Sequence, residues 1–220
     1  ASDVYKRQVA TSGDTGKAAL EGFADVPGTQ IIVFYPSEGV SDIQKQQMIT
    51  QAGKNVKVFG IEGNFDDAQR GVKEIFGNTA LSDELAKKGY TFSSANSINW
   101  GRLVPQIVYY FSAYVDAVKA GKITAGDPIN FVVPTGNFGD ILAGYYAKLM
   151  GLPIDRLLCA SNSNNVLTDF INTGVYDRRR EFFKTVSPSM DILVSSNLER
   201  LLYSVTEHDA ARVADYMKRL

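Results

Sequence analysis

Short apolar runs alternate with amphipathic segments along most of the chain. Four runs are apolar or alternate strictly and are rich in β-branched residues, as strands of a parallel sheet are: residues 30–35, 56–61, 130–133 and 156–160. Helical spacing of apolar residues lies between them, at 15–23, 41–51 (with Ser41 as the cap), 65–76 and 100–120. Strands that alternate with helices predict βαβ units, and therefore an α/β fold with parallel sheets.

The longest helical pattern runs from about residue 100 to 120. Its apolar face is defined by six residues: Val104, Ile107, Val108, Phe111, Val115 and Val118. Pro105 lies inside the pattern, so the helix either kinks at this residue or begins near it.

Small polar residues at 93–99 interrupt the alternation and indicate a boundary between two lobes. We predict a smaller, mobile α/β lobe at 9–93 and part of a larger lobe at 94–220. Residues 1–8 are interpreted as a leader foreign to the native protein, because residues 5–8 are too polar for the strand expected before the loop that follows Val9. The chain stops inside an amphipathic helical pattern, and we therefore expect it to be incomplete at both ends.

Charge and composition exclude several classes of protein. With 23 basic and 24 acidic residues, the net charge of -1 favours neither nucleic acid nor an anionic membrane as a partner. No apolar run approaches the length of a membrane span. One cysteine and one histidine exclude a disulfide framework and a zinc cluster, so we expect no metal site. The expected location is the cytoplasm.

Three loops follow the same plan, in which a strand leads through small polar residues into a helix. The clearest is 134–140, where Gly136 and Gly139 let the backbone approach an anion ahead of the unpaired amides of a helix. This pattern predicts a phosphate site. The alternative is that Asn137 or Asp140 only caps the helix. The loop lacks the leading G-x-G of a dinucleotide fingerprint.

The second loop, at 11–16, brings hydroxyls, a carboxylate and amides to a helix start, which suits a small polar substrate with a carboxylate or phosphate group. Capping by Ser12 or Asp14 is the alternative. The loop is not a P-loop, because Thr11 stands where the first glycine should be and Ala18 where the Mg²⁺-binding hydroxyl should be.

In the third loop, Ser97 and Asn99 precede Arg102 at the start of the long helix. An arginine beside hydroxyl and amide groups can hold a phosphate or carboxylate in bidentate geometry, and the alternative is an arginine that faces solvent.

Together these loops resemble those of threonine synthase, a pyridoxal-phosphate (PLP) enzyme of fold type II. The resemblance extends from Val9 to about Tyr203, and Asp14 and Phe138 are typical of its microbial-type branch. It is carried by five segments: 9–16, 94–99, 102–111, 134–140 and 194–200. It implies a tryptophan synthase β-like α/β fold with two parallel-sheet lobes, the second of which binds PLP.

The resemblance also implies an activity. O-phospho-L-homoserine, the small-molecule partner, would react with water to give L-threonine and phosphate by γ-elimination and β-addition of water. By position, the cofactor-binding residues are Gly136, Asn137, Phe138, Gly139, Asp140 and Asp14. The substrate-binding residues are Ser12, Thr15, Ser97, Asn99 and Arg102. The oligomeric state is left open.

One element of the family is missing. Its Schiff-base lysine lies in a Phe-Lys-Asp motif upstream of the segment matching 12–16, and the chain has no such motif, so we expect these 220 residues alone to be inactive. Two alternatives stay open. One is a PLP-dependent serine/threonine dehydratase or β-replacing synthase, whose substrates offer no γ-phosphate to Arg102. The other is a non-catalytic homologue that binds a small molecule.

Overall fold

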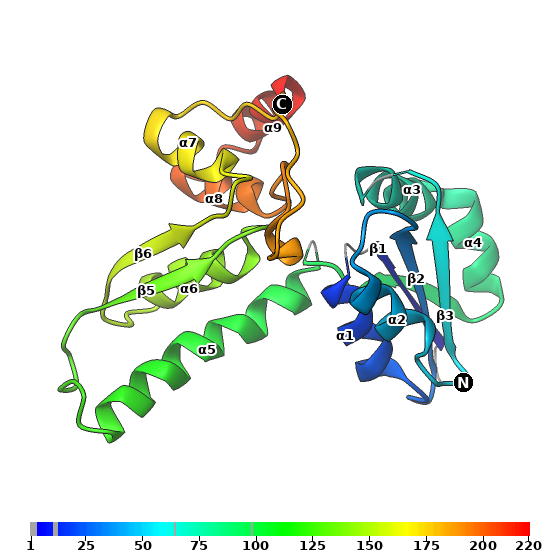
Figure 1. The fold of residues 1–220 in the computed structure, drawn as a ribbon, viewed down its shortest axis with the longest axis horizontal. Coiled ribbons are helices and arrows are strands. Elements are labelled where there is room, and N and C mark those ends of the chain that lie inside the picture. Colours follow the sequence, from blue (N-terminus) through cyan, green and yellow to red (C-terminus); the bar gives the residue numbers. More distant parts are fainter. Residues whose placement is uncertain (1–3, 11–12, 64, 98) are drawn as a thin grey trace. The chain divides into compact units, whose positions relative to one another are not determined.

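The computed structural model describes residues 4–10, 13–63, 65–97 and 99–220, with only the backbone at 4–10 (Figure 1). The chain divides into two compact units, Ala1–Asn99 and Trp100–Leu220. The division falls at the end of the small polar stretch 93–99. The lobe limits 9–93 and 94–220 stay predictions, as does the foreign origin of residues 1–8.

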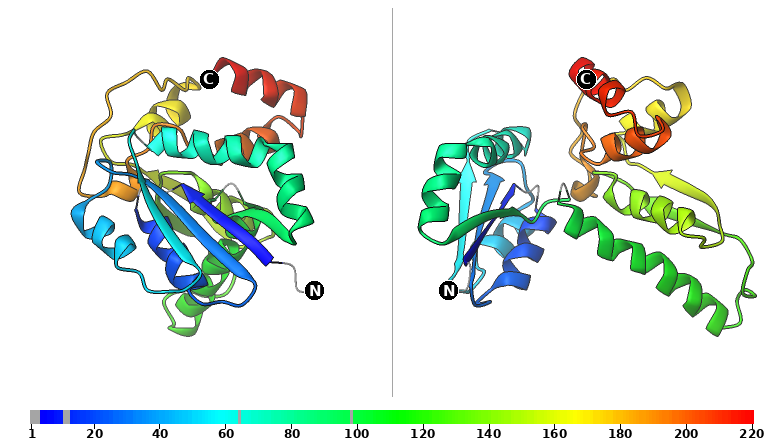
Figure 2. Two further views of the ribbon diagram at one scale, coloured as in Figure 1. Left: turned by 90° about the vertical axis from the view of Figure 1, so that its right-hand side faces the viewer. Right: turned by 180° about the vertical axis from the view of Figure 1, so that it is seen from behind.

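Unit 1 is built on a four-stranded parallel sheet in the order β3-β2-β1-β4 (Figure 2). The strands are β1 (Val4–Ala10), β2 (Thr29–Pro36), β3 (Val56–Ile61) and β4 (Tyr90–Ser94). Residues 4–8 form most of β1 despite their polarity, and β1 pairs with β2 on one side and β4 on the other. Because β1 is a central strand, its backbone hydrogen bonds are satisfied on both edges.

Helices cover both faces of this sheet, as parallel sheets require. They are α1 (Asp14–Phe23), α2 (Asp42–Ile49), α3 (Phe65–Gly77) and α4 (Thr79–Lys87). Alternate side chains of β2 serve the two faces: Ile31 and Val33 pack in the cluster that contains Leu20 and Met48, whereas Phe34 packs with Val72 of α3. The predicted capping of α2 by Ser41 is confirmed, since Ser41 and Gln44 form a reciprocal capping box.

Unit 2 begins with α5 (Trp100–Lys119), followed by a parallel pair of strands, β5 (Ile129–Pro134) and β6 (Ile154–Ala160). The helix α6 (Gly139–Leu149) connects the two strands. The remaining elements are α7 (Val166–Thr173), the short 3₁₀ helix η1 (Pro188–Met190), α8 (Leu198–Val205) and α9 (Ala210–Arg219). All four predicted strands and all four predicted helical segments are confirmed. Within the described residues, no helix is long and apolar enough to cross a bilayer.

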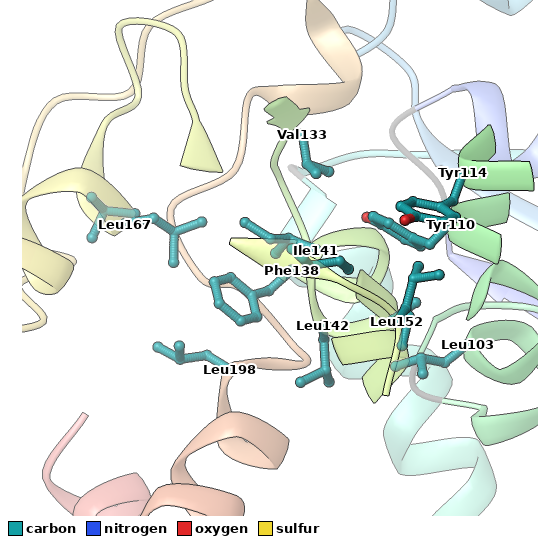
Figure 3. Close-up of a cluster of buried hydrophobic side chains, with 14 residues drawn as sticks. Leu103, Tyr110, Tyr114, Val133, Phe138, Ile141, Leu142, Leu152, Leu167 and Leu198 are labelled. Carbon is teal, nitrogen blue, oxygen red and sulfur yellow. The ribbon is translucent and has the colours of Figure 1, made fainter. Parts of the chain in front are cut away.

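The core of unit 2 lies where α5 packs on α6 (Figure 3). Gly144 allows the close approach, because a Cβ there would lie 2.6 Å from Cε1 of Tyr110 and 2.9 Å from Cδ2 of Leu157. The ring of Tyr110 also packs edge-on against Phe131 of β5, with ring centroids 4.9 Å apart. The hydroxyl of Tyr110 donates to the backbone oxygen of Asp140, which ties the first turn of α6 to α5.

The prediction of the apolar face of α5 is wrong in part. Val104, Val108 and Val115 are exposed, and the buried stripe is carried by Leu103, Tyr110 and Tyr114 instead. Both tyrosines can be buried because their hydroxyls are satisfied: each donates to a backbone oxygen, that of Asp140 at 2.8 Å and that of Asp127 at 2.9 Å, respectively. Pro105 does not mark the start of α5, which begins five residues earlier, at Trp100.

Candidate functional site

The loop between β5 and α6 has an unusual backbone at Phe138. This residue precedes the first residue of α6 and has φ 65° and ψ 4°, a left-handed conformation that a bulky side chain rarely adopts. Its ring is buried in the core of unit 2 with Ile141 and Leu142 (Figure 3). Burial of the ring therefore holds a strained backbone in place, and such strain is concentrated at binding and catalytic sites.

The N-terminus of α6 has no side-chain cap. No cap hydrogen bond is formed there by any described side chain, so the alternative in which Asn137 or Asp140 caps the helix is wrong. Oδ1 of Asn137 is itself buried and accepts no hydrogen bond from the described residues. The first amides of α6 thus keep their donor capacity and the positive end of the helix dipole, which is a suitable site for an anion.

Gly136 is required by the close packing of this loop. A Cβ at Gly136 would lie 2.9 Å from the carbonyl oxygen of Ser189 and 3.0 Å from Cδ1 of Ile192. The obstacle includes backbone, which cannot move aside as a flexible side chain can. The glycine therefore lets segment 188–192 lie directly against the loop, on one side of it.

Asp140, in the first turn of α6, is engaged by Tyr110. The Tyr110 hydroxyl lies 3.2 Å from Oδ1 of Asp140, in addition to its bond to the backbone oxygen. Asp140 is exposed as a residue, but partial desolvation of its carboxyl by the neighbouring chain raises the pKa of that group, and the hydrogen bond from Tyr110 opposes this shift. Burial, followed by the nearby Asp140 carboxylate, raises the pKa of Tyr110, which stays a donor at neutral pH. What Asp140 can offer an anion is its backbone amide.

Two buried residues that the sequence did not single out bind the same loop from the segment before α8. Oγ of Ser195 donates to the carbonyl oxygen of Gly136 at 2.5 Å. Asn197 donates twice to the carbonyl oxygen of Asn137, from its backbone amide and from Nδ2, both at 3.1 Å. Asn197 is fully buried and Ser195 nearly so. Both residues lie in segment 194–200, the fifth segment of the resemblance, to which the sequence analysis assigned no functional residue. Two serines and an asparagine just before an amphipathic helix could have pointed to them.

Unit 1 holds the other predicted residues at the point where its strand order reverses. β2 and β3 extend the sheet on one side of β1, and β4 pairs on the other, so the carboxyl ends of β1 and β4 lie at the same edge of the sheet. Such a switch point is where α/β sheets bind ligands. Asp14 and Thr15 begin α1, which follows β1 in the chain, and Ser97 and Asn99 follow β4. Ser12 lies outside the described residues.

Contacts within unit 1 fix two of these side chains. Oδ1 of Asp14 accepts a hydrogen bond from Nε2 of Gln44 at 2.9 Å. Asp14 is the first residue of α1, and the cap position before it is Gly13, which has no side chain to form a cap bond. Nδ2 of Asn99 donates to the carbonyl oxygen of Ser94 at 2.7 Å, which ties Asn99 to the end of β4. Thr15 and Ser97 are half-buried.

Arg102 lies in the first turn of α5 and is half-buried, and this burial lowers the pKa of its guanidinium, which still carries its charge at neutral pH. Ser97 and Asn99 belong to unit 1 and Arg102 to unit 2. A phosphate grip made by all three residues therefore stays a prediction. No group of three His, Cys, Asp or Glu side chains suited to a metal ion occurs in the part of the chain that the structure describes.

The class of protein follows from these features. The chain has two α/β units with parallel sheets, and in one of them a glycine-containing loop leads into an uncapped helix. The fold is that of the fold-type II PLP-dependent enzymes, as the sequence motifs implied.

Comparison with known proteins gives the particular relatives. The chain is 49% identical over 223 residues to human threonine synthase-like 1 and 46% identical over 208 residues to the threonine synthase of Eremothecium gossypii. These matches cover 98% and 94% of this chain but only 30% and 38% of the relatives. The crystal structure of PLP-bound threonine synthase from Brucella melitensis superposes with a TM-score of 0.82 at 45% identity, over 98% of this chain and 44% of that one.

No protein-family model matches the chain. The similarity to named threonine synthases nevertheless extends over almost the whole of it, in sequence and in structure. The chain is a homologue of the threonine synthases, and the expected resemblance is confirmed. It spans less than half of the length of these relatives.

Proposed function

We propose that this chain forms part of the active site of a threonine synthase that uses PLP to convert O-phospho-L-homoserine and water into L-threonine and phosphate. The observation that carries the proposal is the uncapped N-terminus of α6 behind the left-handed Phe138. A phosphate monoester needs several amide donors that converge on one point, and this loop offers them without a competing side chain.

The loop between β5 and α6 would hold the phosphate group of the cofactor. Gly136, Asn137, Phe138 and Gly139 contribute backbone, and Asp140 contributes the amide of the first helical turn. Oδ1 of Asn137 accepts no hydrogen bond from the described residues, and only a donor group on a ligand, not a phosphate oxygen, would satisfy it. When bound, PLP supplies an electron sink for carbanion chemistry, and the protein supplies position and electrostatics.

The residues at the switch point of unit 1 would face the cofactor ring and the substrate. Asp14, held by Gln44, keeps a carboxylate at the start of α1, and Ser12 and Thr15 add hydroxyl donors. Ser97, Asn99 and Arg102 would hold the phosphate of the substrate until it leaves. Donors that stabilise a departing oxyanion lower the barrier, and the loss of one such donor typically costs about 10²–10³ in rate.

The chain contains no Phe-Lys-Asp motif to supply the Schiff-base lysine. We therefore expect the 220 residues by themselves to bind PLP and to release no phosphate from O-phospho-L-homoserine. Release at rates typical of an enzyme, on the order of 1–10³ per second, would contradict this part of the proposal.

The cofactor assignment is tested by comparing PLP with pyridoxal, which lacks the phosphate. Trp100 is the only tryptophan of the chain and reports binding through its fluorescence. We expect PLP to bind at least about ten-fold more tightly, because charge-assisted hydrogen bonds to the phosphate are lost with pyridoxal. Equal affinities would overturn the cofactor assignment.

The substrate assignment is tested with Arg102→Ala. This variant should lower the affinity for O-phospho-L-homoserine by about ten-fold or more and leave PLP affinity within about three-fold. L-Serine, which carries no phosphate, serves as the comparison ligand. An equal loss for all three ligands would contradict the grip by Arg102 and would favour a dehydratase or β-replacing synthase of the same fold.

A further inference from the structure

The loop that we propose for the cofactor phosphate is held from one side through its carbonyl groups. The hydroxyl of Ser195 binds the Gly136 oxygen, and the amide and side chain of Asn197 both bind the Asn137 oxygen. These contacts join positions about sixty residues apart in the sequence. Ser195 and Asn197 are the buried polar residues of segment 193–197, which leads into α8.

The direction of a carbonyl fixes the direction of the amide in the same peptide group. A trans peptide is planar, and its N–H points opposite to its C=O. With the Gly136 oxygen turned toward Ser195, the amide of Asn137 points away from Ser195. With the Asn137 oxygen turned toward Asn197, the amide of Phe138 likewise points away from Asn197. Two successive amides are thus aimed at the side of the loop opposite to segment 193–197.

The side-chain amide of Asn197 is itself oriented by Arg200. Nε of Arg200 donates to Oδ1 of Asn197 at 3.1 Å, which leaves Nδ2 to face the Asn137 oxygen. The Arg200 guanidinium in turn lies over the ring of Trp100, 5.6 Å from its centroid. The ring of Trp100 packs edge-on against Tyr146 of α6. The orientation of Asn197 is therefore determined by side chains of three different helices.

We propose that Ser195 and Asn197 are positioning residues that aim the amides of Asn137 and Phe138 at a bound phosphoryl group. This inference rests on the proposed function of the loop. Without these donors, either peptide group can rotate and turn its carbonyl oxygen toward the anion, which replaces an attraction by a repulsion. A residue with a purely structural role would lower stability and leave the preference for phosphorylated ligands unchanged.

Ser195→Ala is the main test, because it removes one hydroxyl and changes no charge. The measurements are the affinities of the chain for PLP, pyridoxal and inorganic phosphate, together with the NMR shifts of the Asn137 and Phe138 amides during a phosphate titration. We expect the preference for PLP over pyridoxal to fall by about five- to ten-fold and the shift of the Asn137 amide to shrink. Ser195→Thr, which keeps the hydroxyl, should restore the preference.

Two further variants separate aiming from folding. Arg200→Lys keeps the positive charge but removes the Nε donor to Asn197, and should weaken the PLP preference by a smaller factor, about two- to five-fold, with the fold intact. Ser204→Ala is the matched control, because Ser204 of α8 bonds to the Tyr145 hydroxyl at 3.2 Å, remote from residues 136–138 in sequence. It should lower stability slightly and leave the preference unchanged.

The outcomes distinguish this inference from the function on which it rests. A wild-type chain that binds PLP and pyridoxal equally well overturns the proposed function, and the aiming role with it. A clear wild-type preference that survives in both Ser195→Ala and Arg200→Lys overturns the aiming role alone. A preference that falls in both variants, is regained in Ser195→Thr and is kept in Ser204→Ala supports it.

Discussion

The two units place ligand-binding groups in opposite ways. In the loop between β5 and α6 of unit 2 the candidate groups are backbone amides, fixed by the buried ring of Phe138 and by the buried side chains of Ser195 and Asn197. In unit 1 they are side chains that follow β1 and β4: Asp14 and Thr15 begin α1, where Asp14 is exposed and Thr15 is half-buried.

This difference decides how each site responds to mutation. A backbone site can be changed only through the packing that holds it, so in unit 2 stability and anion binding should change together. A side-chain site at a strand end can lose its chemistry with little effect on the fold, so in unit 1 the two should separate. Four substitutions, two in each unit, test this contrast.

The largest effect is expected for Phe138→Ala. The ring is 5% exposed in the core of unit 2, and its removal should lower the free energy of unfolding by about 3–5 kcal/mol. Urea denaturation measures this loss, and phosphate affinity should fall in the same variant. Phe182→Ala is the control, because Phe182 is 49% exposed and its loss should cost only about 0.5 kcal/mol. Phosphate affinity that persists while stability falls would break the coupling that we expect in unit 2.

Gln44→Glu tests unit 1 at the contact that holds Asp14. The new carboxylate keeps an acceptor for the backbone amide of Ser41 but replaces a donor to Asp14 by a like charge. We expect a loss of about 1–2 kcal/mol in unfolding free energy, partly recovered in high salt. Gln46→Glu, on the exposed face of the same helix, adds the same charge without this contact. An equal loss in both variants would show that the Asp14 contact is not the cause.

The preference for PLP over pyridoxal serves as the second readout for Gln44→Glu. Because we propose that the groups that bind the cofactor phosphate lie in unit 2, this preference should stay within about two-fold of the wild type. A large change would contradict the assignment of phosphate binding to the loop between β5 and α6.

Asp140→Asn should change how the free energy of unfolding depends on pH more than it changes that free energy at any one pH. Partial desolvation places the pKa of the folded carboxyl above its usual 3.8, so Asp140 contributes most to stability below that pH, and its contribution is lost as pH rises through the folded pKa. Relative to the wild type, Asp140→Asn should therefore become more stable as pH increases from about 4 to 7. Urea denaturation across this range measures the trend, and Asp116→Asn, on an exposed position of α5, is the control. A parallel pH profile for both variants would contradict the raised pKa of Asp140 in the folded chain.

The sequence predicted the elements of this fold where the local pattern is strong. Apolar β-branched runs gave four strands, and small polar residues at strand ends located the loops that carry the candidate site. β4 and α4 are among the elements that were not predicted. β4 has only five residues, and three of them, Thr91, Ser93 and Ser94, are polar. The face of α5 was assigned in part wrongly because its buried stripe uses tyrosines whose hydroxyls are satisfied by distant carbonyl groups.

The support of the site depends on tertiary contacts that no local pattern encodes. Whether Asn137 caps a helix or lines an anion site depends on the left-handed backbone of Phe138, whose ring is packed in the core of unit 2. Ser195 and Asn197 bind carbonyl groups about sixty residues away in the sequence. Residue type and spacing could therefore suggest a phosphate loop but could not identify what holds it.

The smallest effect is expected for Lys17→Met, which tests whether a lysine after a glycine-rich loop binds an anion in unit 1. Nζ of Lys17 forms an ion pair with the Glu21 carboxylate, one helical turn further along α1, at 2.7 Å. It also binds the side chain of Gln51, which follows α2. Exposed pairs of this kind contribute little, so the unfolding free energy should change by less than about 0.5 kcal/mol. Phosphate and PLP affinities should be unchanged within error, as measured by Trp100 fluorescence. A loss of phosphate affinity comparable to that of Phe138→Ala would mean that unit 1 also binds the anion through a charged side chain, and the contrast between the two units would fail.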